Sequence, residues 1–310
     1  MVIIGQLLVL FMLILSGFIL VRTGALGGRT TPAFSSLVMN FSLPCLIIVS
    51  LQRPFSAAML GIAGKTLGVS FFVYGLSALL TVFYPGLLGL KGEKRDIHRY
   101  ALIFSNCAFI GIPMVEMVMG RDYLFQLTIY NIPFNLFSFS LGAWLITRKK
   151  AGSFALSYRT FLSPCIIATL TGFILFLFSV SLPGPLYQGL KMAGDMTSPL
   201  STLVIGMNLA GTSLRGVIGS WRPYVTSLVR IAVMPLIVAL PLYLAGIRGA
   251  ALVLPVLVAA MPVAASAALI TSAFDGDSQE SGALVFLSTL FSALSLPLAA
   301  LIIYRLAGSF

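Results

Sequence analysis

The chain has 310 residues, of which 59% are hydrophobic and only 9% charged, and its formal net charge is +11. A soluble domain typically has about 25% charged residues, so this composition excludes a large soluble domain and predicts a polytopic membrane protein. The positive charge does not indicate a nucleic-acid partner, because the basic residues cluster between apolar stretches, which is the pattern of membrane topology.

Ten apolar stretches follow one another, and each is near the length of about 20 residues that a membrane-spanning helix needs. The first lacks the basic start and the cleavage motif of a signal peptide, so we expect it to be a span. Glycine and proline punctuate most of the connections. The expected spans are residues 2–21, 32–51, 58–83, 99–119, 123–147, 160–181, 189–213, 223–245, 250–273 and 281–305.

Lysine and arginine are distributed unevenly between the two sides of these spans. The loops after the odd-numbered spans hold twelve of them and the opposite side five. Positive loops face the cytoplasm, so both termini are predicted on the non-cytoplasmic side of a cell membrane. The basic residues 148–150 divide the chain into residues 1–150 and 151–310, with five spans each. An odd number of spans per half predicts two inverted repeats.

Prolines interrupt apolar stretches at corresponding places in the two halves. Pro44 in the second span matches Pro199 in the seventh, and Pro113 in the fourth matches Pro262 in the ninth. Proline removes an N–H and frees carbonyls of the preceding turn, which within a bilayer must be satisfied by protein or water. Paired interruptions of this kind indicate a transporter's binding site.

The chemistry of these breaks favours an anion. The second half of a broken helix begins with unpaired N–H groups and a partial positive charge, and such ends bind anions readily. We expect Pro113 and Pro262 each to begin a half-helix, so that a carboxylate lies where the two ends meet. The flanking site residues would be Gly111, Ile112 and Ala265, with the carbonyls of Ile110, Gly111, Ala260 and Met261 facing a cation or water.

Three stretches carry a resemblance to a known family. Residues 40–46 read Asn-Phe-Ser-Leu-Pro-Cys-Leu, residues 106–113 read Asn-Cys-Ala-Phe-Ile-Gly-Ile-Pro with Gly120 following, and the third group runs from Met261 to Pro297. Together they resemble the auxin efflux carrier family, in the superfamily that also holds bile-acid transporters. The resemblance implies an all-α protein of ten membrane helices, in which helices 4 and 9 are broken and cross. Helices 3–5 and 8–10 would form a transport domain, and helices 1, 2, 6 and 7 a scaffold through which a homodimer forms. The implied substrates are organic anions.

Four polar residues of the spans are candidate substrate contacts, each with a structural alternative. The resemblance makes Asn106 a substrate contact, the alternative being a cap for freed backbone. Ser266, one turn past Pro262, lines the site or packs between helices. Asn131 and Asn135, one turn apart in the fifth span, line the same cavity or bond between helices.

Ionisable residues within spans are costly and therefore candidates for function. Glu116 is a candidate proton carrier, or a structural residue near the outer end of its span. Lys65 is a fixed cation or a titrating amine, or it reaches to the interface. Arg230 balances an anionic substrate or pairs with a carboxylate, or it too reaches the interface. His98, among charged neighbours, is expected to be a solvated loop residue, and Asp195 to lie near the outer surface beside Lys191.

These features predict a secondary transporter of a small organic anion that works by alternating access. The cysteines match neither a zinc site nor a disulfide framework, and we expect no metal or cofactor. A Walker motif is missing, so a proton or sodium gradient or the membrane potential would drive transport. A sodium-coupled bile-acid-type symporter and a cation/proton antiporter are the alternatives, although an antiporter generally needs paired carboxylates. A non-transporting sensor stays open, whereas a single histidine outside the spans disfavours an enzyme.

Overall fold

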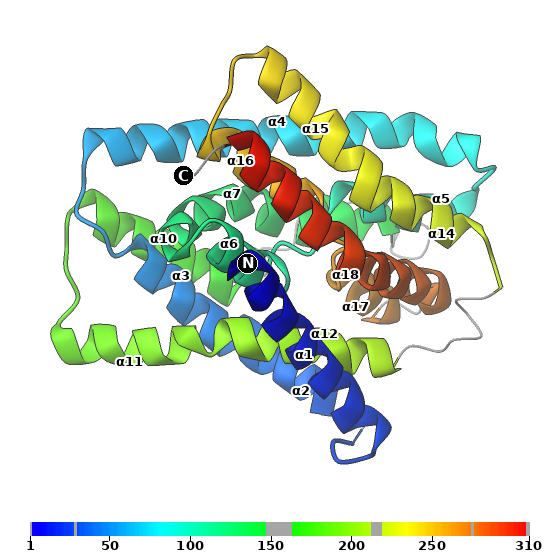
Figure 1. Ribbon diagram of the computed structural model, residues 1–310, viewed down its shortest axis with the longest axis horizontal. Helices are drawn as coiled ribbons and strands as arrows, with labels where there is room; N and C mark the ends of the chain where they lie inside the picture. The colour runs from blue at the N-terminus through cyan, green and yellow to red at the C-terminus, as the bar shows by residue number, and fades with distance from the viewer. Residues whose placement is uncertain (1, 28–29, 147–162, 212–218, 274–275, 308–310) are drawn as a thin grey trace. The chain divides into compact units, whose positions relative to one another are not determined.

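The computed structural model describes residues 2–27, 30–146, 163–211, 219–273 and 276–307, and every regular element in these ranges is helical (Figure 1). This confirms the all-helical expectation for the described residues. The first half contains α1 (Val2–Arg22), α2 (Thr30–Leu37), η1 (Val38–Ser42), α3 (Leu43–Leu51), α4 (Ala57–Leu87), α5 (Gly92–Ile103), α6 (Gly111–Val118), η2 (Arg121–Tyr123), α7 (Leu124–Phe137) and η3 (Ser138–Gly142). The second half contains α10 (Pro164–Leu177), α11 (Gly184–Asp195), α12 (Thr197–Gly211), α14 (Arg222–Leu228), η4 (Val229–Val233), α15 (Met234–Leu244), α16 (Ala250–Ala259), α17 (Ser266–Ala273) and α18 (Ser278–Ala307).

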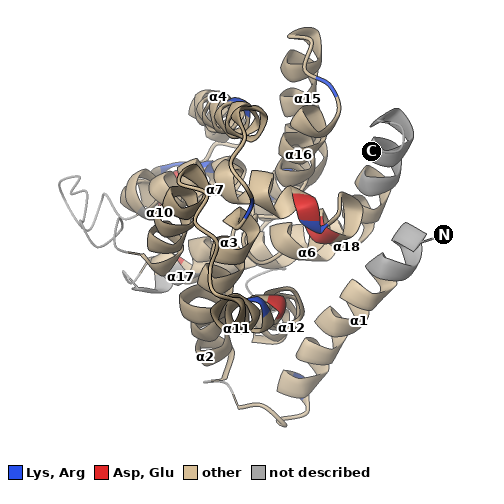
Figure 2. Ribbon diagram, turned by 90° about the vertical axis from the view of Figure 1, so that its left-hand side faces the viewer, with Lys and Arg blue, Asp and Glu red and all other residues tan. Residues whose placement is uncertain are grey.

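Among the described residues, five helical segments are long and apolar enough to cross a membrane, and charged residues are sparse along the ribbon (Figure 2). The basic residues 148–150 lie outside the described residues. Ten spans in two inverted repeats, and the sidedness of the termini, therefore stay predictions. The five segments are Thr30–Leu51, Ala57–Leu87, Arg121–Ile146, Arg222–Leu244 and Ser278–Ala299.

Three of these segments contain a wider, π-helical turn, namely η1, η3 and η4. The expected break at Pro44 is wrong, because the helical segment continues through the proline from Thr30 to Leu51, with the π-helical turn η1 ending two residues before it. Pro44 sits just after η1, in the first turn of α3, where a missing N–H is tolerated. Near Pro199 the chain is interrupted, because α11 ends at Asp195 and α12 begins at Thr197. Turns of the π type frequently mark functional positions.

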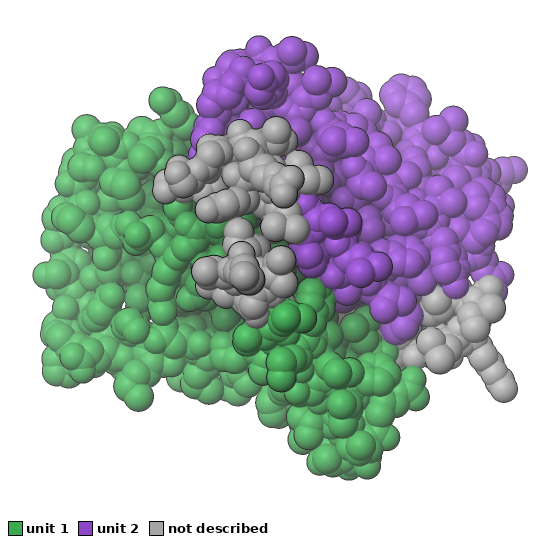
Figure 3. Space-filling view, viewed as in Figure 1, with its two compact units in different colours: residues 1–68, 108–135, 158–211 green, residues 69–107, 136–157, 212–310 purple. Residues whose placement is uncertain are grey.

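The chain divides into two compact units, coloured separately in Figure 3. Unit 1 comprises residues 1–68, 108–135 and 158–211, and unit 2 comprises residues 69–107, 136–157 and 212–310. Each unit takes segments from both halves of the chain, so neither follows the expected boundary at residue 150. The division of the sequence into repeats 1–150 and 151–310 stays a prediction.

Glycines allow the helices of unit 1 to pack closely. A Cβ on Gly206 of α12 would lie 1.8 Å from the Ile14 carbonyl oxygen of α1, and one on Gly17 would lie 2.1 Å from the Leu203 carbonyl oxygen. Gly194 of α11 approaches the Leu46 backbone of α3 in the same way. Small residues at helix contacts are the usual means of close approach between helices in membranes. The α1–α12 contact therefore depends on the absence of side chains at Gly17 and Gly206.

Unit 2 is built around α18, which packs against α5, α14, α16 and α17. One buried cluster joins Val73 of α4 to Val238 and Leu242 of α15 and to Ala259 of α16. A second joins Ala283 and Leu287 of α18 with the partly buried Tyr224 of α14. These contacts hold the C-terminal ends of α5 and α16 inside one unit. The two ends are the points at which the fourth and ninth expected spans are interrupted.

Candidate functional site

Two interrupted helices meet within unit 2. The helix α5 stops at Ile103 and the chain becomes extended at Phe104, while α16 stops at Ala259 and α17 starts at Ser266. Ser105 and Val263 form an antiparallel bridge between the two extended segments. This meeting of residues 104–106 with 262–264 is called the crossing below.

The backbone groups freed by the two breaks satisfy each other. The Asn106 N–H donates to the Pro262 carbonyl oxygen at 2.8 Å, and the Ala264 N–H donates to the Phe104 carbonyl oxygen at 3.1 Å. Buried backbone groups without partners are costly, and in a bilayer no lipid group could replace these bonds. The crossing is therefore a closed backbone junction rather than a pair of open helix ends.

The position of Pro262 differs from the expectation. It does not begin a half-helix, because α17 starts four residues later at Ser266 and Pro262 lies in the extended segment, where its carbonyl is an acceptor. Pro113 does lie in the first turn of its half-helix, α6, which starts at Gly111. The helix N-terminus in the ninth expected span is thus at Ser266, next to Ala265.

Arg230 ties both broken helices together. Its guanidinium donates from Nη1 to the Leu102 carbonyl oxygen of α5 at 2.6 Å and from Nε to the Met261 carbonyl oxygen at 3.1 Å. The residue sits in η4 and is only 2% exposed, so reaching to the interface is wrong. The helix dipole makes the C-terminal end of α5 negative, and a buried cation stabilises it. The Met261 carbonyl, expected to face a cation or water, faces this guanidinium.

A hydroxyl of α18 completes the backbone junction. The Ser288 Oγ accepts a hydrogen bond from the Val263 N–H at 3.0 Å, and both residues are buried. We expect Ser288→Ala to lower the free energy of unfolding by about 1–3 kcal/mol, because it leaves a buried N–H unsatisfied. Thermal unfolding of the purified protein measures this loss. Ser292→Ala is the matched control, since the Ser292 hydroxyl donates only to the Thr289 carbonyl of its own helix at 2.7 Å; equal losses for both variants would contradict the role of Ser288.

Ser266 and Asn106 are both buried beside the crossing, at 9% and 4% exposure. The Ser266 hydroxyl lies 2.8 Å from the Tyr100 hydroxyl of α5, which lies 2.5 Å from Ser138 in η3. Ser266 therefore takes part in a hydrogen-bonded chain of three hydroxyls across α5, η3 and α17. Unit 2 thus brings together Asn106, Arg230, Pro262 and Ser266 from the expected site.

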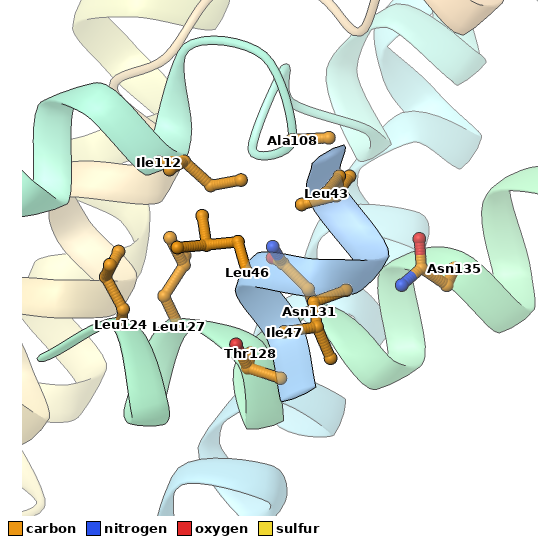
Figure 4. Close-up of a pocket in the computed structure, with 10 residues that line it drawn as sticks. All are labelled: Leu43, Leu46, Ile47, Ala108, Ile112, Leu124, Leu127, Thr128, Asn131 and Asn135. Carbon is orange, nitrogen blue, oxygen red and sulfur yellow. The ribbon is translucent and has the colours of Figure 1, made fainter. Parts of the chain in front are cut away.

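Unit 1 contains five of the expected substrate-binding residues, whereas Ala265 lies in unit 2; the five are Gly111, Ile112, Pro113, Asn131 and Asn135. Ile112, Asn131 and Asn135 line one small pocket of about 20 Å³, together with aliphatic side chains of α3 and α7. In Figure 4, Asn131 lies among these aliphatic side chains and Asn135 to one side. The volume suits about one water molecule. A direct substrate contact of these asparagines, of Gly111 or of Ile112 stays a prediction.

The candidate coupling residues Glu116 and Lys65 are both in unit 1. Glu116 accepts a hydrogen bond from Ser198 at 2.6 Å, is 3.8 Å from Arg121, and borders a cavity of about 300 Å³. Arg121 also pairs with Asp195, which Lys191 contacts at 2.9 Å, so Asp195 lies beside Lys191 as expected. Lys65 is exposed on α4. Glu116 is therefore part of an ion-pair group, and its role in coupling stays a prediction.

The position of His98 differs most from the sequence expectation. It is not a solvated loop residue, because it is fully buried on α5, with Nε2 2.9 Å from a Glu280 carboxylate oxygen and Nδ1 2.6 Å from the Thr226 hydroxyl. Lys94 contacts the other Glu280 oxygen at 2.8 Å. This hydrogen bond raises the pKa of Lys94, so the amine stays charged at neutral pH. The charged residues beside His98 in the sequence led to the expectation that it is exposed. Its position one turn before the apolar Leu102, on the same face of the helix, was a usable signal that it is buried.

A larger cavity of about 460 Å³ lies in unit 2. Its volume is within the range of small-molecule sites. The lining is mainly aromatic and aliphatic, with Phe71, Tyr74, Phe104, Phe137 and Trp144 as its largest side chains. Phe104 connects this cavity to the crossing.

Among the described residues, no group of three or more His, Cys, Asp or Glu side chains could hold a metal ion. Cys45, Cys107 and Cys165 are all buried, and within the described part of the chain none of them forms a disulfide.

Two comparisons with known proteins bear on the whole chain. The sequence model of a family described as membrane transport protein matches residues 2–155 and 151–300. A curated protein of Methanothermobacter thermautotrophicus, described as an uncharacterized transporter, is 28% identical over 290 residues. This similarity covers 92% of the chain and 93% of the relative, so it extends across both units.

Proposed function

Because this chain belongs to the auxin efflux carrier family of membrane transport proteins, we propose that it is a secondary transporter that moves a small organic anion by alternating access. The observation that carries the proposal is the crossing, where two interrupted helices meet and a buried arginine supplies positive charge. Interrupted helices near the midplane are where secondary transporters bind substrate. The first turn of α17, beginning at Ser266, adds the partial positive charge of a helix N-terminus.

The charge at the crossing supports an anion over a sodium ion. A sodium ion needs several oxygen ligands, and the carbonyls of Leu102 and Met261 already accept hydrogen bonds from Arg230. The guanidinium would also repel a cation placed between them. An antiporter needs carboxylates that bind and release ions, but Glu116 and Asp195 share Arg121 as a partner. Both alternatives are therefore less favoured than transport of an organic anion.

Uptake into liposomes tests the proposed function. The purified protein is reconstituted, and labelled monocarboxylates and dicarboxylates are offered under imposed pH, sodium or voltage gradients and in counterflow. We expect saturable uptake of at least one acid that empty liposomes do not show. Absence of uptake and counterflow for every acid, with folded protein, would count against the proposal.

Two substitutions test the proposed place of binding. Asn106→Ala and Ser266→Ala should each reduce uptake about tenfold, because a hydrogen bond to a charged group contributes about 1.5–3 kcal/mol. Ser16→Ala is the control, since the Ser16 hydroxyl donates to the Met12 carbonyl of its own helix. If both crossing variants transport as well as Ser16→Ala, the substrate binds elsewhere.

A further inference from the structure

A hydrogen-bonded group with a buried histidine at its centre lies in unit 2 apart from the crossing. It is called the His98 network and consists of His98, Glu280, Lys94, Thr226 and Tyr84. His98 bridges Thr226 of α14 and Glu280 of α18, and the Thr226 hydroxyl lies 2.9 Å from the Tyr84 hydroxyl of α4. Four helices therefore contribute to one chain of hydrogen bonds within unit 2. The chain contains a single histidine, and histidine is the side chain that ordinarily changes charge between pH 5 and 8.

We propose that His98 is the proton-binding residue of this protein and that its protonation couples the proton gradient to movement at the crossing. The inference rests on the proposed function, since it names the coupling ion and its site. It replaces Glu116 and Lys65 as the residues on which coupling depends.

The observed positions of the heavy atoms are compatible with both charge states of His98. When it is neutral, Nε2–H donates to Glu280, and Nδ1 accepts from the Thr226 hydroxyl, which itself accepts from Tyr84. One added proton on Nδ1 reverses this end: Nδ1–H then donates to the Thr226 oxygen, and the Thr226 hydroxyl turns toward the Tyr84 oxygen. Every heavy-atom contact is kept, while the Tyr84 hydroxyl hydrogen turns away from Thr226. The proton is therefore taken up with the direction of these hydrogen bonds reversed and the chain from Tyr84 to Glu280 intact.

The surrounding charges favour a reversible proton site. Glu280 is balanced by Lys94, which also lies 3.8 Å from Asp277, so the group of His98, Glu280 and Lys94 changes from neutral to a single positive charge. Glu93 accepts from the Asp277 N–H at 2.7 Å, and Arg222 of α14 contributes positive charge near Lys94. On α5 itself, Asp96 is paired with Arg95 and Arg99.

The network is exposed at its Lys94 end. The Lys94 side chain is 47% exposed, whereas the Glu280 side chain is 6% exposed and His98 is fully buried. A proton can therefore reach Glu280 and then His98 from the face on which Lys94 lies. From His98 and Thr226, α5 and the α14–η4 segment continue toward the crossing.

The same two helical segments carry a bond of the proton site and, one turn further along, a bond that holds the crossing. His98 bonds Thr226, and four residues further along both helices Leu102 bonds Arg230. Residues four apart lie on the same face of a helix, so these two bonds are successive rungs between α5 and the α14–η4 segment. On α18, Glu280 contacts His98 and Ser288 contacts Val263. A change of charge at His98 thus acts on the helices that hold the crossing backbone.

Nuclear magnetic resonance of the single histidine tests the site without any transport assay. Protein labelled with ¹⁵N-histidine, with any polyhistidine tag removed, is titrated from pH 5 to 8. We expect the imidazole ¹⁵N signals of the wild type to change reversibly over this range, and those of Glu280→Gln to follow a different curve, because Glu280 is the carboxylate that the ring contacts. Asp122→Asn, which alters an exposed carboxylate in unit 1, should leave the curve unchanged. Signals that stay constant from pH 5 to 8 would refute the proposal.

Transport in liposomes tests the coupling. His98→Gln keeps a hydrogen-bonding side chain but removes the titrating ring, so we expect counterflow within about twofold of wild type and loss of the accumulation driven by a pH gradient. Unchanged gradient-driven accumulation with an unchanged pH dependence would overturn the proposal. If His98→Gln loses counterflow as well, the NMR titration of the wild type decides whether His98 binds a proton. If the wild type transports no acid at all, the proposed function fails, and the titration still shows whether His98 binds a proton.

Discussion

Arg230→Met should abolish most transport and lower the apparent melting temperature by about 5 °C or more. The substitution leaves the carbonyls of Leu102 and Met261 buried without their donor, at a cost of about 1–3 kcal/mol each. It also removes the positive charge that we propose attracts the anion. Arg230→Lys should give an intermediate result, because an ammonium keeps the charge but lacks the planar fork that reaches two acceptors.

Arg248→Met is the matched control for this prediction. Arg248 also donates to two carbonyls, those of Tyr243 and Ile247, but these contacts are exposed. Melting temperature and counterflow are measured for the Met variants of both arginines. If Arg230→Met transports and melts like Arg248→Met, the guanidinium does not hold the crossing.

Gly206→Ala should destabilise unit 1 strongly, and more than Gly211→Ala, which adds the same methyl group to the same helix. The new Cβ would lie 1.8 Å from the Ile14 carbonyl oxygen, so α1 and α12 would have to move apart. Overpacking of this kind costs about 1–3 kcal/mol, and here the obstacle is backbone, which cannot turn away as a side chain can. We expect the apparent melting temperature of the detergent-purified protein to fall by about 5 °C or more.

Gly211→Ala provides the comparison on the same helix. A Cβ on Gly211 meets nothing within 4 Å, and alanine is the better helix former. Its melting temperature should equal or exceed that of wild type. If the Gly206→Ala protein has the same melting temperature as Gly211→Ala, α1 and α12 are not in close contact.

The crossing was predictable in part. Matching prolines at 113 and 262 showed that two apolar segments are interrupted, and the structure has breaks in both. The helix start at Ser266 was not predictable, because proline disfavours the α conformation for the residue before it but does not say where the next helix begins. That start depends on the pairing of residues 104–106 with 262–264, which brings together segments more than 150 residues apart.

The partners of the buried residues Arg230 and His98 were beyond sequence reasoning. Arg230 was expected to face a substrate, a carboxylate or the interface, and it binds carbonyls of α5 and of the segment after α16. His98 was expected in solvent, and it is buried against α14 and α18. In both cases the local sequence shows the charge but not the helix that packs over it.

The sequence by itself determined that this is an all-helical membrane protein of the auxin efflux carrier family with two interrupted segments. The helical membrane class and the two interruptions follow from composition, from the length of apolar stretches and from proline, which act within about 20 residues of chain, whereas the family follows from the order and spacing of three sequence motifs. Only the tertiary structure decided which groups satisfy the interrupted backbone, namely Arg230, Ser288 and the paired extended segments. The physical reason is that hydrogen bonds between distant segments form only after helices pack, and no local pattern specifies which donors and acceptors then meet.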